Sequence, residues 1–137
     1  MRIMGIDYGD ARTGVALSDL RCSIVGSAMV VRSRNTDKAI ADIVDIAHKN
    51  EVGKIVVGLP RNMDGTEGPR AELCRCFADQ LAAATGLEVV MWDERRTTVE
   101  AHNILSNHNY HGQKRKDTVD AVAASLILEG YLAFLGR

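Results

Sequence analysis

Three carboxylates lie in surroundings that are unusual for charged side chains. Asp7 follows the apolar run 3–6 of a predicted strand, Glu94 follows the apolar run 87–92, and Asp120 lies in an otherwise apolar helix. Burying an unpaired charge is costly, so each acid needs a partner. Taken singly, each also has an ordinary explanation. Asp7 and Glu94 could be exposed strand ends, and Asp120 could stabilise a helix N-terminus.

Brought together by the fold, the three acids would do metal chemistry. Carboxylates about 5 Å apart repel one another by about 3 kcal/mol at an effective dielectric constant near 20, so a cluster must bind protons or a cation. A site made of carboxylate oxygens prefers Mg²⁺ or Mn²⁺ to zinc. Such ions activate water and stabilise the leaving oxygen in phosphodiester hydrolysis. The sequence contains no zinc-spaced Cys and His cluster and no G-x-S-x-G motif that would indicate another chemistry.

Basic side chains flank the same positions, as a nucleic-acid substrate requires. Arginine also suits bidentate contacts to phosphate. The near-equal numbers of basic (17) and acidic (18) residues mean that any such surface is a local patch. Aromatic residues are only 4% of the chain, so base stacking is not expected to be a main binding mode. The predicted phosphate-binding residues are Arg12, Arg61, Arg70, Arg95, Arg96, Lys114, Arg115 and Lys116.

The composition indicates one globular domain, residues 1–137. No apolar run approaches the roughly 20 residues that a membrane span needs, so no membrane partner is expected. Three cysteines, an odd number without C-x-x-C spacing, indicate reduced thiols. Together with the lack of a signal-peptide pattern, this predicts a cytoplasmic protein.

The order of predicted elements defines the fold class. Three strands with short connections predict an antiparallel start, and two later strands entered through helices predict parallel crossovers. We therefore predict an α/β fold of three layers, a five-stranded mixed sheet with helices on both faces. Strands are expected around residues 3–7, 15–17, 24–32, 54–58 and 87–92; helices are expected to begin near residues 36, 69, 97 and 117, and the last runs to 135.

Two loops and one helix face bear on the site. The loop 59–68 lacks the Gly-Lys-Ser/Thr ending of a P-loop, but it follows a central strand and so could line the site. Segment 106–112 is predicted to be a loop. His102, His108 and His111 could transfer protons, although exposed histidines need no special explanation. Asp120 shares a helix face with Ala124 and Ile127, so it points where an apolar residue is expected.

Four segments of the chain resemble motifs of the YqgF family. These RNase H-like proteins are named as pre-ribosomal RNA nucleases or Holliday junction resolvases. The segments follow the family's order and spacing from one end of the chain to the other, which makes the match specific. They are 5–9 with 12–19, 58–70, 92–98, and 113–116 with 119–124.

The resemblance implies an RNase H-like fold with strand order 3-2-1-4-5. It implies that Asp7, Glu94 and Asp120 are the metal-binding catalytic acids, and that the loop 58–68 and the basic residues 114–116 border the substrate groove. The family often has Lys where this chain has Ala11, so one phosphate contact is missing here. It further implies a monomer or a homodimer, and a resolvase acting on a four-way junction needs two active sites.

The favoured function is a Mg²⁺- or Mn²⁺-dependent nuclease that processes the 5' end of pre-16S ribosomal RNA in ribosome biogenesis. Structured RNA is thus the expected partner, and branched DNA the next. The alternatives are a Holliday junction resolvase and a non-catalytic protein that binds nucleic acid or a transcription complex. ATP-binding sugar kinases and actin-like proteins open with a similar strand and hairpin, but they need two such domains, and this chain has length for one.

Overall fold

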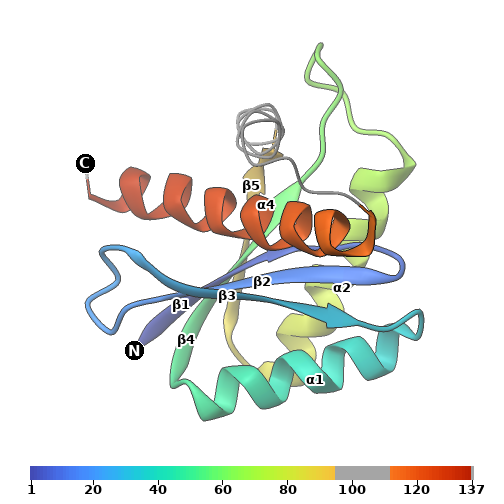
Figure 1. Cartoon of the computed structure of the whole chain (residues 1–137). Coiled ribbons are helices and arrows are strands. Elements are labelled where there is room, and N and C mark those ends of the chain that lie inside the picture. Colours follow the sequence, from blue (N-terminus) through green and yellow to red (C-terminus); the bar gives the residue numbers. More distant parts are fainter. Residues whose placement is uncertain (95–111, 137) are drawn as a thin grey trace.

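The computed structural model describes residues 1–94 and 112–136; for 112–118 it describes the backbone alone. A five-stranded sheet, ordered β3-β2-β1-β4-β5, lies between helices on both faces, as Figure 1 shows. The predicted three-layer fold and strand order are confirmed. The strands are β1 (Arg2–Asp7), β2 (Arg12–Ser18), β3 (Val25–Arg32), β4 (Val52–Leu59) and β5 (Glu88–Asp93); the helices are α1 (Thr36–Lys49), α2 (Pro69–Thr85) and α4 (Gly112–Leu135).

The central strand β1 decides which residues meet at one edge of the sheet. It pairs antiparallel with β2, where Asp7 lies opposite Gly14, and parallel with β4. Strand β5 is parallel to β4, and Leu59 lies opposite Asp93. The carboxyl ends of β1, β4 and β5 therefore lie at the same edge, which is where open α/β sheets commonly bind ligands.

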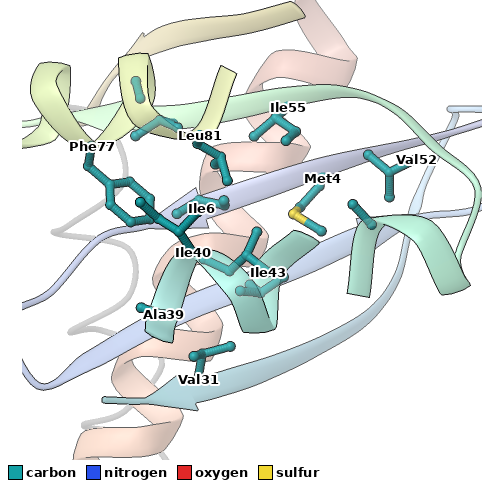
Figure 2. Close-up of a cluster of buried hydrophobic side chains, with 14 of the residues drawn as sticks. Met4, Ile6, Val31, Ala39, Ile40, Ile43, Val52, Ile55, Phe77 and Leu81 are labelled. Atoms are coloured by element: carbon teal, nitrogen blue, oxygen red, sulfur yellow. The ribbon is translucent and has the colours of Figure 1, made fainter. Parts of the chain in front are cut away.

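Helices α1 and α2 cover one face of the sheet and enclose the larger core (Figure 2). Asn35 caps α1, and its side chain accepts a hydrogen bond from the backbone N–H of Lys38. Helix α2 begins at Pro69, and Gly86 ends it in the left-handed conformation with φ 71°. Both ends agree with the sequence-based expectation. The fully buried side chains here include Met4, Ile6, Ile43, Ile55, Phe77 and Leu81.

Of the helices that the structure describes, α4 covers the opposite face of the sheet (Figure 1). Ala124, Ile127 and Leu128 are its fully buried contacts. The helix lies very close to β1, because a Cβ atom added at Gly5 would be only 2.7 Å from Cβ of Leu128. A glycine in the strand thus sets how closely the helix approaches.

Helix α4 begins earlier than the sequence pattern predicts. It starts at Gly112 rather than at Asp117, because the intervening Gln, Lys and Arg residues are good helix formers. Asp120 therefore lies beyond the first two turns, which rules out its explanation as an N-terminal capping acid. Strand β4 is also longer than predicted, since Val52 pairs with Arg2 of β1.

The helix predicted from Thr97 lies outside the described residues, as does most of the loop predicted at 106–112. None of the helices that the structure describes is both long and apolar enough to span a bilayer.

Candidate active site

Two of the three acids meet at the carboxyl edge of the sheet. Asp7 ends β1, and Glu94 directly follows β5, with β4 between them. Their carboxyl groups are hydrogen-bonded to each other. Gly58 of β4 makes room for this contact, because a Cβ atom there would lie 2.8 Å from Cδ of Glu94. The sheet topology thus joins two acids that are far apart in the sequence.

The electrostatics of this pair differ strongly from those of exposed acids. Burial, followed by the charge and hydrogen bond of Glu94 and the charge of Asp120, raises the pKa of Asp7 from 3.8 to about 9. Burial also raises the pKa of Glu94, while the hydrogen bond from Asp7 and the charge of Arg70 oppose the shift. At neutral pH the Asp7 carboxyl therefore keeps its proton and donates a hydrogen bond to the Glu94 carboxylate.

The third acid, Asp120, is bound to an arginine. Arg12 Nε donates to Asp120 Oδ2 at 2.9 Å. Burial raises the pKa of Asp120, and the Arg12 guanidinium opposes that shift. Gly14 lets α4 approach at this point, because a Cβ atom there would lie 2.0 Å from the Asp120 carbonyl oxygen.

The structure therefore brings Asp7 and Glu94 into contact and places Asp120 near enough for its charge to raise the pKa of Asp7. Within residues 1–94 and 119–136, no three His, Cys, Asp or Glu side chains are close enough to hold one metal ion jointly.

The acids have the chemistry that a hard divalent cation requires. All three candidate ligands are carboxylates, which suits an oxygen-preferring ion. A positive charge between Asp7 and Glu94 would oppose the burial and the negative charge of Glu94, which together now keep a proton on Asp7. A metal would thus replace that proton.

The predicted phosphate-binding arginines of the described chain are all paired. Arg70 Nη1 donates to Asp10 Oδ1 at 3.0 Å, and its Nη2 donates to the Tyr8 carbonyl oxygen. Its guanidinium also lies 5.3 Å above the centre of the Tyr8 ring. Arg61 forms ion pairs with Glu67 and Asp93, at 3.5 and 4.0 Å. Each arginine therefore has an intramolecular partner that a substrate phosphate would have to replace.

Other predicted site residues fall outside the part of the chain whose side chains are described. Arg95, Arg96 and the three histidines of segment 102–111 lie among the residues not described. The backbone of Lys114, Arg115 and Lys116 belongs to α4, and their side chains are not described.

Sequence analysis missed the partners of the site residues. Arg12 and Asp120 are 108 positions apart, and no pattern links them. Gly14 and Gly58 did carry a usable signal, since a glycine inside a strand often marks the close approach of another group.

Curated relatives match the chain from end to end. A protein of Halothermothrix orenii named "Putative pre-16S rRNA nuclease" is 46% identical, and the match covers 100% of this chain and 98% of that protein. A protein of the same name from Carboxydothermus hydrogenoformans is 44% identical over 100% of this chain and 99% of its own.

Solved structures show the same fold at low sequence identity. Thermus thermophilus RuvC, in complex with a Holliday junction substrate, aligns with a TM-score of 0.61 and 14% identity, over 100% of this chain and 97% of its own. The resolvase of Fowlpox virus aligns over the whole of both chains, with a TM-score of 0.60 and 9% identity.

The sequence model described as "RuvX: Holliday junction resolvase" matches residues 1–133. The names of the family and of its curated relatives confirm the prediction of a nuclease, a hydrolase of phosphodiester bonds. The chain belongs to the RuvX (YqgF) family.

Proposed function

We propose that this protein is a divalent-metal-dependent nuclease that cleaves structured RNA, namely the precursor of 16S ribosomal RNA near its 5' end. The observation that carries the proposal is the half-buried pair of Asp7 and Glu94, in which the pKa of Asp7 is raised to about 9. Strongly shifted acids at the carboxyl edge of a sheet are typical of catalytic sites. The names of the relatives support the choice of RNA.

Asp7 and Glu94 would hold the metal, and Asp120 would complete its ligands by leaving Arg12. We propose Mg²⁺ or Mn²⁺, because the donor atoms are carboxylate oxygens. Such an ion supplies polarisation of the phosphate and a bound water that is more acidic than bulk water. Arg70 binds the carbonyl oxygen of Tyr8, the residue after Asp7, so it positions the end of β1. Arg61, Arg95, Arg96 and the basic residues 114–116 would contact phosphates on either side.

Cleavage of four-way DNA junctions is the second candidate. The description of the family names it, and two solved structures with the same fold, RuvC of Thermus thermophilus and the resolvase of Fowlpox virus, contain a Holliday junction. Symmetric cleavage of a junction needs two active sites, which this chain would provide as a homodimer, whereas RNA processing could be done by a monomer.

A direct comparison of substrates tests the proposal. Purified protein is incubated with a precursor RNA that carries the 5' leader of 16S RNA and, separately, with a synthetic four-way DNA junction. Each reaction contains Mg²⁺, Mn²⁺ or excess EDTA. We expect metal-dependent cleavage of the RNA and none in EDTA. Cleavage of the junction alone would select the second candidate, and binding without cleavage of either substrate would contradict a nuclease.

A further inference from the structure

Beside the acid pair, one carboxylate is held between two arginines. Arg75 of α2 binds Glu67 through two hydrogen bonds, Nε to Oε1 and Nη2 to Oε2, both 2.7 Å long. Arg61 reaches the same Oε2 at 3.5 Å. Arg61 also lies 4.0 Å from Asp93, the residue before Glu94. We call Arg61, Glu67 and Arg75 the arginine clamp, and it adjoins the candidate active site through Asp93.

The two arginines of the arginine clamp are arranged as in a phosphate-binding site, and the Glu67 carboxylate occupies the position that a phosphate would take. A guanidinium binds two oxygens of a carboxylate or of a phosphate in the same fork arrangement. Both arginines converge on a single oxygen of Glu67, so an anion in the place of that carboxylate would contact both. Sequence analysis predicted Arg61 as a phosphate-binding residue, but nothing in the sequence connected it with Arg75.

The arginine clamp is open to solvent, which makes exchange of the anion feasible. The side chains of Glu67 and Arg75 are 31% and 46% exposed. Ion pairs of this kind contribute little net stability, because water solvates the separated charges well. A hollow of about 470 Å³, lined by Glu67, Gly68, Pro69, Glu72 and Arg75, adjoins the pair. Glu67 could therefore leave without opening the core.

We propose that Arg61 and Arg75 bind a backbone phosphate of the nucleic acid beside the acid pair, and that Glu67 fills this site in the free protein. The proposal rests on the proposed function for the class of substrate. Glu67 then competes with the nucleic acid for the two arginines. A nucleic acid that offers a single phosphate gains little binding energy by displacing Glu67, whereas one whose backbone contacts several basic side chains at once can displace it. If Glu67 served only to hold the loop after β4 against α2, its replacement would weaken nucleic-acid binding, whereas replacement of a competitor would strengthen it.

The salt dependence of binding separates these two roles. Affinities of Glu67→Gln and wild type are measured in EDTA, so that nothing is cleaved, with a labelled RNA hairpin and with a labelled four-way DNA junction. Glu72→Gln is the matched control, because Glu72 lines the same hollow and its loss changes the net charge equally. We expect Glu67→Gln to bind more tightly and its log–log salt slope to steepen by about 1 to 2, as one or two freed arginines take up phosphates.

In the double variant Glu67→Gln/Arg75→Gln, the log–log salt slope should be less steep by about 1 than in Glu67→Gln, because one phosphate-binding arginine is lost. Equal slopes for Glu67→Gln and Glu72→Gln, or weaker binding by Glu67→Gln, would overturn the phosphate site. Absence of binding by every variant to both probes would overturn it too. The two nucleic acids show whether the phosphate comes from RNA or DNA. If Glu67→Gln steepens the slope but wild type cleaves neither substrate with Mg²⁺, the phosphate site stands and the nuclease proposal fails.

Discussion

Along β1, Met4 and Ile6 face α1 and α2 and are fully buried, whereas Gly5 and Asp7 face α4. Strand β2 repeats the division, with Val15 towards the larger core and Gly14 beneath Asp120 of α4. One face of the sheet buries bulky apolar side chains and so supplies stability. The other face carries glycines, which allow α4 to approach closely and bring Asp120 near the edge of the sheet.

The largest effect is expected from replacing Asp7, the acid with the most strongly shifted pKa. Asp7→Asn should abolish cleavage, because it removes a proposed metal ligand. It should also raise the free energy of unfolding at pH 7 by up to about 4 kcal/mol, since the wild-type carboxyl is protonated when folded and ionised when unfolded. Nuclease assays and urea denaturation in EDTA measure the two effects.

The contribution of Asp7 to the free energy of unfolding has a defined pH dependence. Below pH 3.8 both states of the wild type keep the proton of Asp7, so the acid has no effect. Between pH 3.8 and about 9 the unfolded state alone releases it, and the free energy of unfolding should fall by up to about 1.4 kcal/mol per pH unit. Asp7→Asn should have a shallower slope, because the contribution of Asp7 is lost while the raised pKa values of Glu94 and Asp120 still contribute. Asp42→Asn on α1, an exposed control, should keep both the slope and the activity; an unchanged slope in Asp7→Asn would contradict the assignment.

A pair of neighbouring substitutions tests the division between the two faces. Gly14→Ala places a Cβ atom 2.0 Å from the Asp120 carbonyl oxygen, so α4 must move; we expect a loss of about 1 to 3 kcal/mol in stability and at least about tenfold in cleavage. Val15→Ala on the other face should lose roughly 2 kcal/mol through lost burial and keep its activity per folded molecule. Thermal denaturation measures the stabilities, and cleavage is compared at a temperature at which both variants are folded. Equal cleavage activities of the two variants would refute the functional difference between the two faces of the sheet.

The smallest effect concerns the ion pair that holds Asp120. Arg12→Gln should raise the pKa of Asp120 further, because the opposing positive charge is lost. We expect cleavage to fall about tenfold near pH 6 and to recover partly as the pH rises, with stability changed by less than about 1 kcal/mol. Lys38→Gln removes an exposed ion pair on α1 and should leave the pH profile unchanged. A pH-independent loss in Arg12→Gln would assign Arg12 to the substrate instead.

The layers and the location of Asp7 and Asp120 could be predicted from the residues, and the strand order from the resemblance to the YqgF family. Alternation along β1 and helical spacing around Asp120 depend on local geometry, which neighbouring residues determine. The contact between Arg12 and Asp120, and the sharing of Glu67 by two arginines, could not be predicted. Such contacts depend on side-chain rotamers and on the distance between elements, and these follow from the packed molecule alone. The start of α4 was missed because basic residues favour a helix as well as a solvated loop.

The separation in sequence of the acids has a consequence for the protein during its synthesis. Asp7 belongs to the first strand, whereas Asp120 belongs to α4, after all five strands have been made. A nascent chain that carries the sheet without α4 holds two of the three acids and leaves the glycine-lined face of β1 and β2 uncovered. On the proposed mechanism, an incomplete chain would not cleave nucleic acid, because the helix that carries Asp120 is synthesised last.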